Sequence, residues 1–228
     1  MRWFDRLAPL CMCVSMVLVP FSAQAGDEDP WEGTNRAIFK VNDTLDTYAF
    51  KPLAQGYQKV TPQFLEDGIH NMFQNLGDVG NFANNVLQAK PHAAGVDTAR
   101  LLMNTIFGLG GFFDVATKMG LQRSDEDFGQ TLGYWGVPSG PYVVLPFFGP
   151  STVRDAPSIY VDGLTAPYPY INDIGVRNSI FGLNIVDTRA SYLSMEKVIS
   201  GDKYVFVRNA FLQNREFKVK DGKVEDDF

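Results

Sequence analysis

Few side chains in this sequence of 228 residues could act as nucleophiles, acid–base groups or metal ligands. The two cysteines, Cys11 and Cys13, lie in a segment that we expect to be removed, and the two histidines are His70 and His92. Thiolates and imidazoles are the usual zinc ligands, and histidine is the usual acid–base group near neutral pH. With so few of them, we predict no metal site, no cofactor and no catalytic residue.

One serine has glycine neighbours that resemble those of a hydrolase nucleophile. Ser139 lies in the run Gly136–Gly140, but its spacing differs from the G-x-S-x-G of a nucleophile elbow. No G-x-x-x-x-G-K-S/T run that would cradle nucleotide phosphates is present. The sequence therefore favours a protein that is not an enzyme. An interfacial lipase or acyltransferase, with Ser139 and a distant His70 or His92, is the less favoured alternative.

The first 25 residues have the pattern of an export signal. Arg2 and Arg6 precede an apolar run over residues 7–21, and Ala23-Gln24-Ala25 follows as a cleavage site. Cleavage between Ala25 and Gly26 is therefore predicted. A lipoprotein signal would need small residues before a cysteine, but Leu10 and Met12 stand there. We therefore expect no acyl anchor.

Charge and composition limit the class of protein further. The sequence has 20 basic and 26 acidic side chains; removal of residues 1–25 takes away two arginines and one aspartate, which leaves a net charge of −7. Nucleic-acid binding needs basic side chains that displace counterions, so we predict no nucleic-acid partner. The apolar content of 45% excludes global disorder. We expect one helical domain over residues 26–217 and a charged tail over residues 218–228.

Helical spacing of apolar residues dominates the chain. Helix starts are predicted at Asp29-Pro30, Thr61-Pro62, Pro91, Ser124 and Asp202, because aspartate, serine and threonine cap helices and proline suits their first turn. The second of these helices carries an apolar stripe from Leu65 to Val86, which Gly77 and Gly80 could interrupt. A further stripe runs from Ile185 to Ile199. Strict alternation is limited to Tyr142–Leu145, so the predicted class is all-α.

Proline, glycine and aromatic residues are concentrated between Tyr134 and Tyr170. Paired phenylalanines beside glycines occur here and shortly before it, and such pairs are better suited to an acyl-chain interface than to a packed core. We predict a membrane-facing rim of Phe112, Phe113, Phe147 and Phe148. The same helical stripes also fit an ordinary globular core, which is the alternative interpretation.

Two further sets of residues are candidates for a functional site. Asp97, Arg100 and Asn104 form a narrow polar face on an otherwise apolar helix and are predicted to line a polar path. In the loop that follows Trp135, glycines can adopt positive φ while prolines fix φ near −65°, which indicates a shaped hinge. This predicted gate comprises Gly136, Val137, Pro138, Ser139, Gly140, Pro141 and Tyr142.

Four ordered motifs resemble those of the MlaA (VacJ) family. They are the opening motif from Asp29 with Asn35, Arg36, Phe39 and Asn42, then Asn104 to Ala116, Asp127 to Gly133, and Gly136 to Pro146 with Gly149-Pro150-Ser151. The likeness extends over residues 29–215.

The resemblance implies a ring-like arrangement of amphipathic helices that lies in the periplasmic leaflet of the Gram-negative outer membrane. It implies a non-enzymatic protein that removes phospholipid misplaced in the outer leaflet and passes it to a soluble periplasmic carrier. The implied partners are phospholipid, a trimeric porin and that carrier, and the loop from Gly136 is implied to border the channel. A structural porin adaptor without a lipid path is the alternative.

Overall fold

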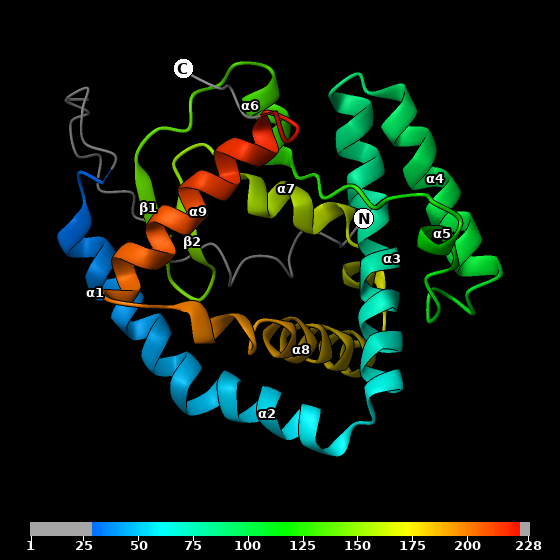
Figure 1. Ribbon diagram of the computed structural model, residues 1–228, viewed down its shortest axis with the longest axis horizontal. Coiled ribbons are helices and arrows are strands. Elements are labelled where there is room, and N and C mark those ends of the chain that lie inside the picture. The colour runs from blue at the N-terminus through cyan, green and yellow to red at the C-terminus, as the bar shows by residue number, and fades with distance from the viewer. Residues whose placement is uncertain (1–28, 224–228) are drawn as a thin grey trace, which may run out of the picture.

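The computed structural model describes residues 29–223. The predicted signal segment, its cleavage site at Ala25 and Gly26, and the last five residues of the predicted tail lie outside these residues. Within them the chain is mainly helical with one small hairpin, which confirms the all-α class (Figure 1). The main helices are α1 Glu32–Leu45, α2 Lys51–Val60, α3 Gln63–Leu87, α4 Pro91–Ile106, α6 Phe128–Tyr134, α7 Ser158–Thr165, α8 Ile174–Ser191 and α9 Lys203–Val219.

Shorter elements connect these helices. They are the π-helical turn η2 Asp46–Phe50, the single-turn helix α5 Val115–Lys118, the 3₁₀ turns η3 Tyr168–Tyr170 and η4 Met195–Val198, and the strands β1 Tyr142–Leu145 and β2 Gly149–Thr152. The strands pair antiparallel, with Tyr142 opposite Thr152. Strand β1 is the segment in which the sequence alternates.

The long helices form a frame. In Figure 1, α1 and α2 run along the left and lower edges, α9 forms the upper left and α3 closes the frame on the right, with α4 and α5 beyond it. Helices α7 and α8 lie inside this outline. The expected ring-like arrangement is visible in that view. Among residues 29–223, none of the helices is both long and apolar enough to cross a membrane.

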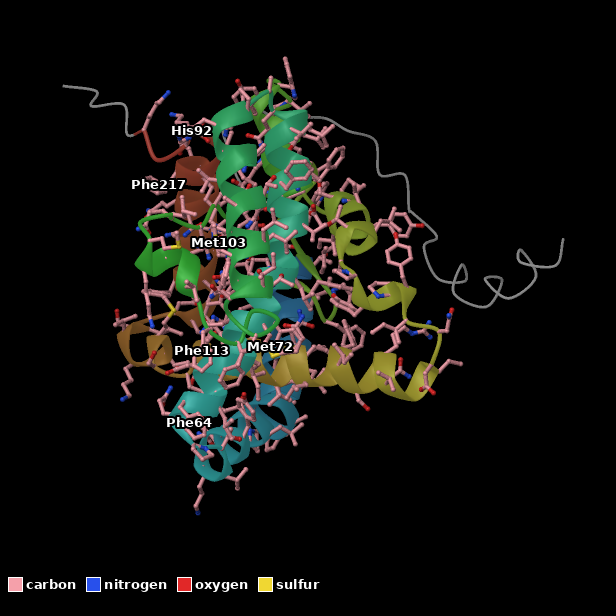
Figure 2. The ribbon with its side chains drawn as sticks, turned by 90° about the vertical axis from the view of Figure 1, so that its right-hand side faces the viewer. Phe64, Met72, His92, Met103, Phe113 and Phe217 are labelled. Atoms are coloured by element: carbon pink, nitrogen blue, oxygen red, sulfur yellow. The ribbon has the colours of Figure 1, made fainter. Side chains whose placement is uncertain are left out.

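The buried side chains are mainly polar, and many large apolar side chains are exposed. On α3 the buried side chains include Asn75, Asp78 and Asn81, whereas Phe64 and Met72 are exposed. Figure 2 shows the outer side of α3 and α4, with Phe64 and Met72 on α3 and Phe113 in the turn that follows α4. None of the apolar residues in the α3 stripe from Leu65 to Val86 is fully buried, so this stripe does not form the core of an ordinary globular fold.

The apolar core is small and lies where the hairpin meets α1 and α9. It consists of Tyr142, Val144 and Tyr204, and partly buried neighbours such as Ile38 and Phe211 pack against it. Most of the remaining interior is held by hydrogen bonds and ion pairs. Since a buried polar group without a partner is costly, these contacts must be nearly complete for the fold to be stable.

Several predicted helix ends are confirmed and others are displaced. Pro91 begins α4, and the Asp202 carboxylate caps α9 by accepting the amide N–H of Tyr204 at 2.9 Å. Ser124 caps no helix; α6 begins later, and Asp127 caps it by accepting the N–H of Gln130 at 2.8 Å.

The bounds of three other helices also differ from the predictions. Gly77 and Gly80 do not interrupt α3, and α8 begins at Ile174, before the predicted stripe. Helix α9 continues to Val219 and includes the first two residues of the predicted tail, where Lys218 pairs with Asp125.

Candidate functional site

The opening motif holds the hairpin against α1. The Asn35 side chain donates to the carbonyl of Tyr142 at 3.0 Å and accepts the N–H of Val144 at 2.9 Å. Two helical turns later, Asn42 donates to the carbonyl of Leu145 and accepts the N–H of Phe147, both at 2.9 Å. A spacing of seven places both side chains on one face of α1. The two asparagines thus extend the hydrogen bonding of β1 along a helix.

The other two residues of this motif join α1 to α9. Arg36 lies over the ring of Tyr204, 4.4 Å from its centroid, and pairs with Asp202 at 2.8 Å. Phe39 meets the same tyrosine edge to face, with 5.5 Å between ring centroids. The opening motif therefore fixes the position of the hairpin and, with it, the position of the adjoining loop.

The loop before β1 has the backbone geometry predicted for it. Gly136 has φ +85° and Gly140 has φ +66°. Between them Val137 and Pro138 are exposed. Arg154, after β2, holds the middle of the loop: its Nη1 donates to the carbonyl of Val137 at 3.3 Å, and its amide donates to the carbonyl of Ser139 at 3.1 Å. The loop is anchored on one side and open at its tip.

Tyr142 does not belong to an exposed gate. Its side chain is completely buried, and its ring meets those of Tyr204 and Phe211. Burial raises the pKa of its hydroxyl to about 12. Tyr142 is a core residue that anchors the end of the loop, so the predicted gate is corrected to Gly136–Pro141.

Three of the four predicted rim phenylalanines are exposed. Phe113, Phe147 and Phe148 have 48%, 76% and 68% of their surface exposed. Phe147 has φ +67°, which is unusual for a bulky residue and is maintained by the hydrogen bond from its N–H to Asn42. Phe112 differs, because its ring packs on α3 where a β-carbon at Gly68 would overlap it. Phe112 is therefore corrected to a packing residue.

The predicted polar path is a closed contact between α3 and α4. Asp97, Arg100 and Asn104 are 0–2% exposed. Arg100 donates to the hydroxyl of Thr117 at 2.9 Å and to the carbonyl of Leu121 at 2.6 Å, and its guanidinium lies 3.4 Å from the carboxylate of Asp114. These side chains do not line a path open to solvent, because neighbouring segments cover all of them.

Asparagines on α3 complete this interior and were missed by the sequence interpretation. Asn85 donates to Asp97 at 2.7 Å, and Asn81 donates to the carbonyl of Ser124 at 2.7 Å. Asp78 is fully buried between Arg100 and Arg123, with ion-pair distances of 3.4 and 3.0 Å. Burial raises the pKa of its carboxyl group, although both arginines oppose this shift. The sequence did carry a signal for this buried polar network, because acidic and amide residues recur at helical spacing from residue 75 to residue 85.

The geometry does not support a serine hydrolase. His70 donates from Nδ1 to the carboxylate of Asp187 at 2.8 Å and accepts at Nε2 from the side-chain amide of Gln74 at 2.6 Å, so both ring nitrogens are engaged. Its pKa is raised, chiefly by the hydrogen bond to Asp187. Within residues 29–223, no hydrogen bond joins Ser139 to His70 or His92. The described part of the chain, residues 29–223, contains no cluster of histidines and carboxylates that could hold a metal ion.

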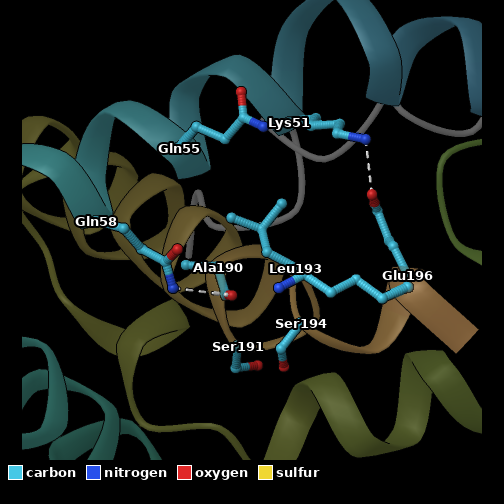
Figure 3. A pocket seen from close by; sticks show the side chains of 9 residues that line it. Lys51, Gln55, Gln58, Ala190, Ser191, Leu193, Ser194 and Glu196 are labelled. Atoms are coloured by element: carbon cyan, nitrogen blue, oxygen red, sulfur yellow. Dashed lines mark hydrogen bonds and ion pairs between the residues drawn. The ribbon is translucent and has the colours of Figure 1, made fainter.

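Two cavities adjoin α8. The larger, about 600 Å³, lies between α2 and the end of α8, and Figure 3 shows Lys51 paired with Glu196 across it. The ion-pair distance is 2.7 Å, and Gln58 donates to the carbonyl of Ala190 at 3.3 Å. The smaller, about 280 Å³, lies on the inner side of α3 and is lined by residues of α7 and α8.

Comparison with known proteins identifies the family. The family model described as MlaA lipoprotein matches residues 27–218. The chain belongs to the MlaA family. Its resemblance to that family in the four motifs is thereby confirmed.

Relatives of this MlaA-family chain align over most of its length. The intermembrane phospholipid transport system lipoprotein MlaA of Escherichia coli (strain K12) is 36% identical over 231 residues, which cover 96% of this chain and 91% of the relative. The protein of the same name from Haemophilus influenzae is 34% identical over 203 residues, with coverages of 86% and 81%. A solved structure on the structural basis for maintenance of bacterial outer membrane lipid asymmetry matches with a TM-score of 0.72 and 32% identity, over 84% of this chain and 98% of that chain.

Proposed function

We propose that the protein removes phospholipid from the outer leaflet of the outer membrane and passes it to a soluble periplasmic carrier, without chemical change to the lipid. The observation that carries this proposal is the inverted fold, with amides and ion pairs inside and large apolar side chains outside. Such a surface is suited to contact with lipid rather than water. Membership of a family named for intermembrane phospholipid transport supports the same conclusion.

The proposed location is the periplasmic leaflet of the outer membrane. Exposed apolar residues occur on α2, α3, α4, α7 and α8, so they surround much of the frame. Helices that lie in one leaflet are held by such residues without crossing the bilayer. We propose a trimeric porin as the protein partner that gives access to the outer leaflet, as the family resemblance implies. The alternative is an adaptor that binds the porin but moves no lipid.

A protein of this kind would lower a barrier and would not set a direction. The acyl chains of a phospholipid are stable in the bilayer, but moving its charged headgroup through hydrocarbon is strongly unfavourable. A protein that offers polar groups to the headgroup and apolar side chains to the acyl chains lowers that cost. Since the sequence has no nucleotide-binding run, the free energy for net transport is proposed to come from components downstream.

Complementation tests the proposed function. A Gram-negative strain that lacks its own MlaA protein should regain outer-membrane lipid asymmetry when it expresses this chain, as measured by the phospholipid exposed in the outer leaflet. Porin co-purification should be measured in the same cells. Porin binding without recovery of asymmetry would contradict transport and favour the adaptor.

The loop over Gly136–Pro141 is proposed to gate lipid entry. Gly136→Val with Gly140→Val forces side chains into positive φ, at a cost of about 1–3 kcal/mol per site. We expect the strained loop to lose its shape while the helices stay folded, so that lipid asymmetry is lost but porin binding is kept. The measurement is outer-leaflet phospholipid in cells whose single copy is the variant.

A matched control is available for this backbone strain. Gly120 and Gly201 also have positive φ, +86° and +73°, and open space around them, but they lie outside the loop. Gly120→Val with Gly201→Val should therefore leave asymmetry intact. Normal asymmetry in the loop variant, at a normal protein level, would contradict the gate.

A further inference from the structure

The smaller cavity joins segments that are far apart in the sequence. Its walls come from α3, the segment before α6, the end of α7, η3 and α8, and α3 contacts both α7 and α8 (Figure 1). Two glycines of α3 shape it. A β-carbon at Gly77 would lie 3.0 Å from Nη2 of Arg123, and one at Gly80 would lie 3.1 Å from the hydroxyl of Thr165. The glycines that could have broken α3 instead permit close approach from the cavity side.

The cavity contains one cation whose outer nitrogens are available. Arg123 uses its Nε to contact Asp78 at 3.0 Å. Neither Nη1 nor Nη2 takes part in a hydrogen bond or ion pair with another side chain or carbonyl in residues 29–223. A guanidinium with two such nitrogens matches the oxygens of a phosphate group. The backbone of α3 at Gly77 supports it from behind.

The cavity also contains one carboxylate without an ion pair. Three of its four acidic side chains are paired: Asp125 with Lys218, Glu126 with Lys90 and Asp127 with Arg215.

The fourth carboxylate is that of Asp162. It accepts the backbone N–H of Phe128 at 2.9 Å, and within residues 29–223 no cation pairs with it. Burial raises the pKa of Asp162 to about 6. A partly buried carboxylate in this state gains from a cation that a ligand brings.

We propose that this cavity binds the zwitterionic headgroup of a phospholipid, with Arg123 on the phosphate and Asp162 on the ammonium group. This inference rests on the proposed function and names the headgroup class that the protein prefers. A volume of about 280 Å³ is at the lower end of ligand pockets, so it suits a headgroup and not a whole lipid. Phe73 and Tyr168 also line the cavity, and aromatic rings attract ammonium groups.

The test compares headgroups on one acyl length. The full mature chain, in an uncharged detergent, is titrated with dihexanoyl-phosphatidylethanolamine and with dihexanoyl-phosphatidylglycerol by calorimetry. We expect the ethanolamine lipid to bind about tenfold more tightly, because its ammonium pairs with the carboxylate of Asp162. Phosphoethanolamine and inorganic phosphate are titrated in parallel. Binding of inorganic phosphate as tight as that of the ethanolamine lipid would assign the site to free phosphate and overturn the proposal.

Two substitutions separate the role of Asp162 from that of Arg123. Asp162→Asn keeps an oxygen for the N–H of Phe128 but removes the charge, so it should abolish the headgroup preference by weakening the ethanolamine lipid alone. Gly77→Ala should displace the guanidinium of Arg123 and weaken both lipids about equally, without loss of helix stability. Gly95→Ala is the matched control, since a β-carbon there meets nothing within 4 Å.

A pH series gives a second readout. The carboxylate of Asp162 faces Asp127 and Arg215, and Glu126, Asp125 and Arg123 share its cavity. From about pH 5 to about pH 7, binding of the ethanolamine lipid should strengthen as this carboxylate ionises, because the phosphate and ammonium of the lipid do not titrate there. Asp162→Asn should remove that dependence. His70, whose pKa is affected by Arg123, titrates equally in both proteins and cancels in the comparison.

The outcomes distinguish this inference from the proposed function. Equal binding of the two lipids, or a preference that survives Asp162→Asn, would overturn the headgroup site and leave the function to the complementation test. Failure of complementation with an intact preference would instead contradict the transport function.

Discussion

Arg100→Gln is expected to lower the thermal midpoint of the protein in detergent by about 6–20 °C. Arg100 is 1% exposed and is the largest fully buried side chain among the described residues. It lies 3.4 Å from both Asp78 and Asp114. Removal of one partner from a buried ion pair costs about 3–5 kcal/mol, because the remaining charge is left uncompensated. In a domain of this size about 1 kcal/mol corresponds to a shift of about 2–4 °C.

The loss of stability in the Arg100→Gln variant should depend on pH in a defined direction. The pKa of Asp78 is raised in the folded protein, so the native state binds a proton there more readily than the unfolded chain does. Stability from this group is therefore present at low pH and lost as pH rises through the folded pKa. Loss of Arg100 should raise that pKa further. The difference between variant and wild type is then expected to shrink as the pH falls and Asp78 is protonated.

An exposed cation supplies the control. Lys59 is exposed on α2, and its replacement by Gln should change the midpoint little. Circular dichroism melts of the three proteins over the pH series make the comparison. A midpoint for Arg100→Gln equal to that of the Lys59 control would show that the interior of the α3–α4 pair does not depend on this cation.

Helix ends were predictable where a single residue decides them. Pro91 and Asp202 mark starts because proline has no N–H to donate and aspartate accepts free N–H groups. Ser124 had the same local signal, but its hydroxyl donates to Asp97 across the interior instead. A tertiary hydrogen bond of this kind cannot be read from the local sequence, so the start of α6 was misplaced.

The direction of each helix face was not predictable from periodicity. The spacing on α3 shows that its apolar residues share one side and its asparagines another, but not which side meets the surroundings. In water the apolar side would be buried. Here Phe64 and Met72 are exposed and Asn75 and Asp78 are buried, as expected for helices that contact lipid. The same reversal explains why Asp97 and Asn104, predicted to line a path, are closed inside the α3–α4 contact.

The candidate site was predicted in part. Glycine positions with positive φ followed from the mixture of glycine and proline, since only glycine adopts that region at little cost. The role of Asn35 and Asn42 in holding β1 could not be inferred, because it requires contacts more than 100 residues apart. The cavity with Arg123 was likewise not predictable, because segments that are far apart in the sequence build it.

Membrane attachment is expected to depend strongly on three exposed phenylalanines. Phe113, Phe147 and Phe148 lie in turns beside glycines and are available for insertion. Each buried phenylalanine contributes about 1.5–3 kcal/mol, so replacing all three with Ser removes about 4–9 kcal/mol of gross insertion free energy. Even if insertion is partial, binding of the mature chain to phospholipid vesicles should weaken at least about 100-fold, which corresponds to about 2.7 kcal/mol. Vesicle flotation measures the bound fraction.

The same three positions provide the matched control. Replacing Phe113, Phe147 and Phe148 with Leu keeps apolar side chains there, so this variant should float nearly as the wild type does. Circular dichroism should show unchanged helix in both variants, because these side chains are exposed in turns and the ring contact of Phe113 is with Phe112 in the same turn. Flotation of the Ser variant at the wild-type level would place the attachment on the other exposed apolar residues, such as Phe64 and Phe107. Loss of helix in the Ser variant would instead show that the three rings support the fold, which their exposure argues against.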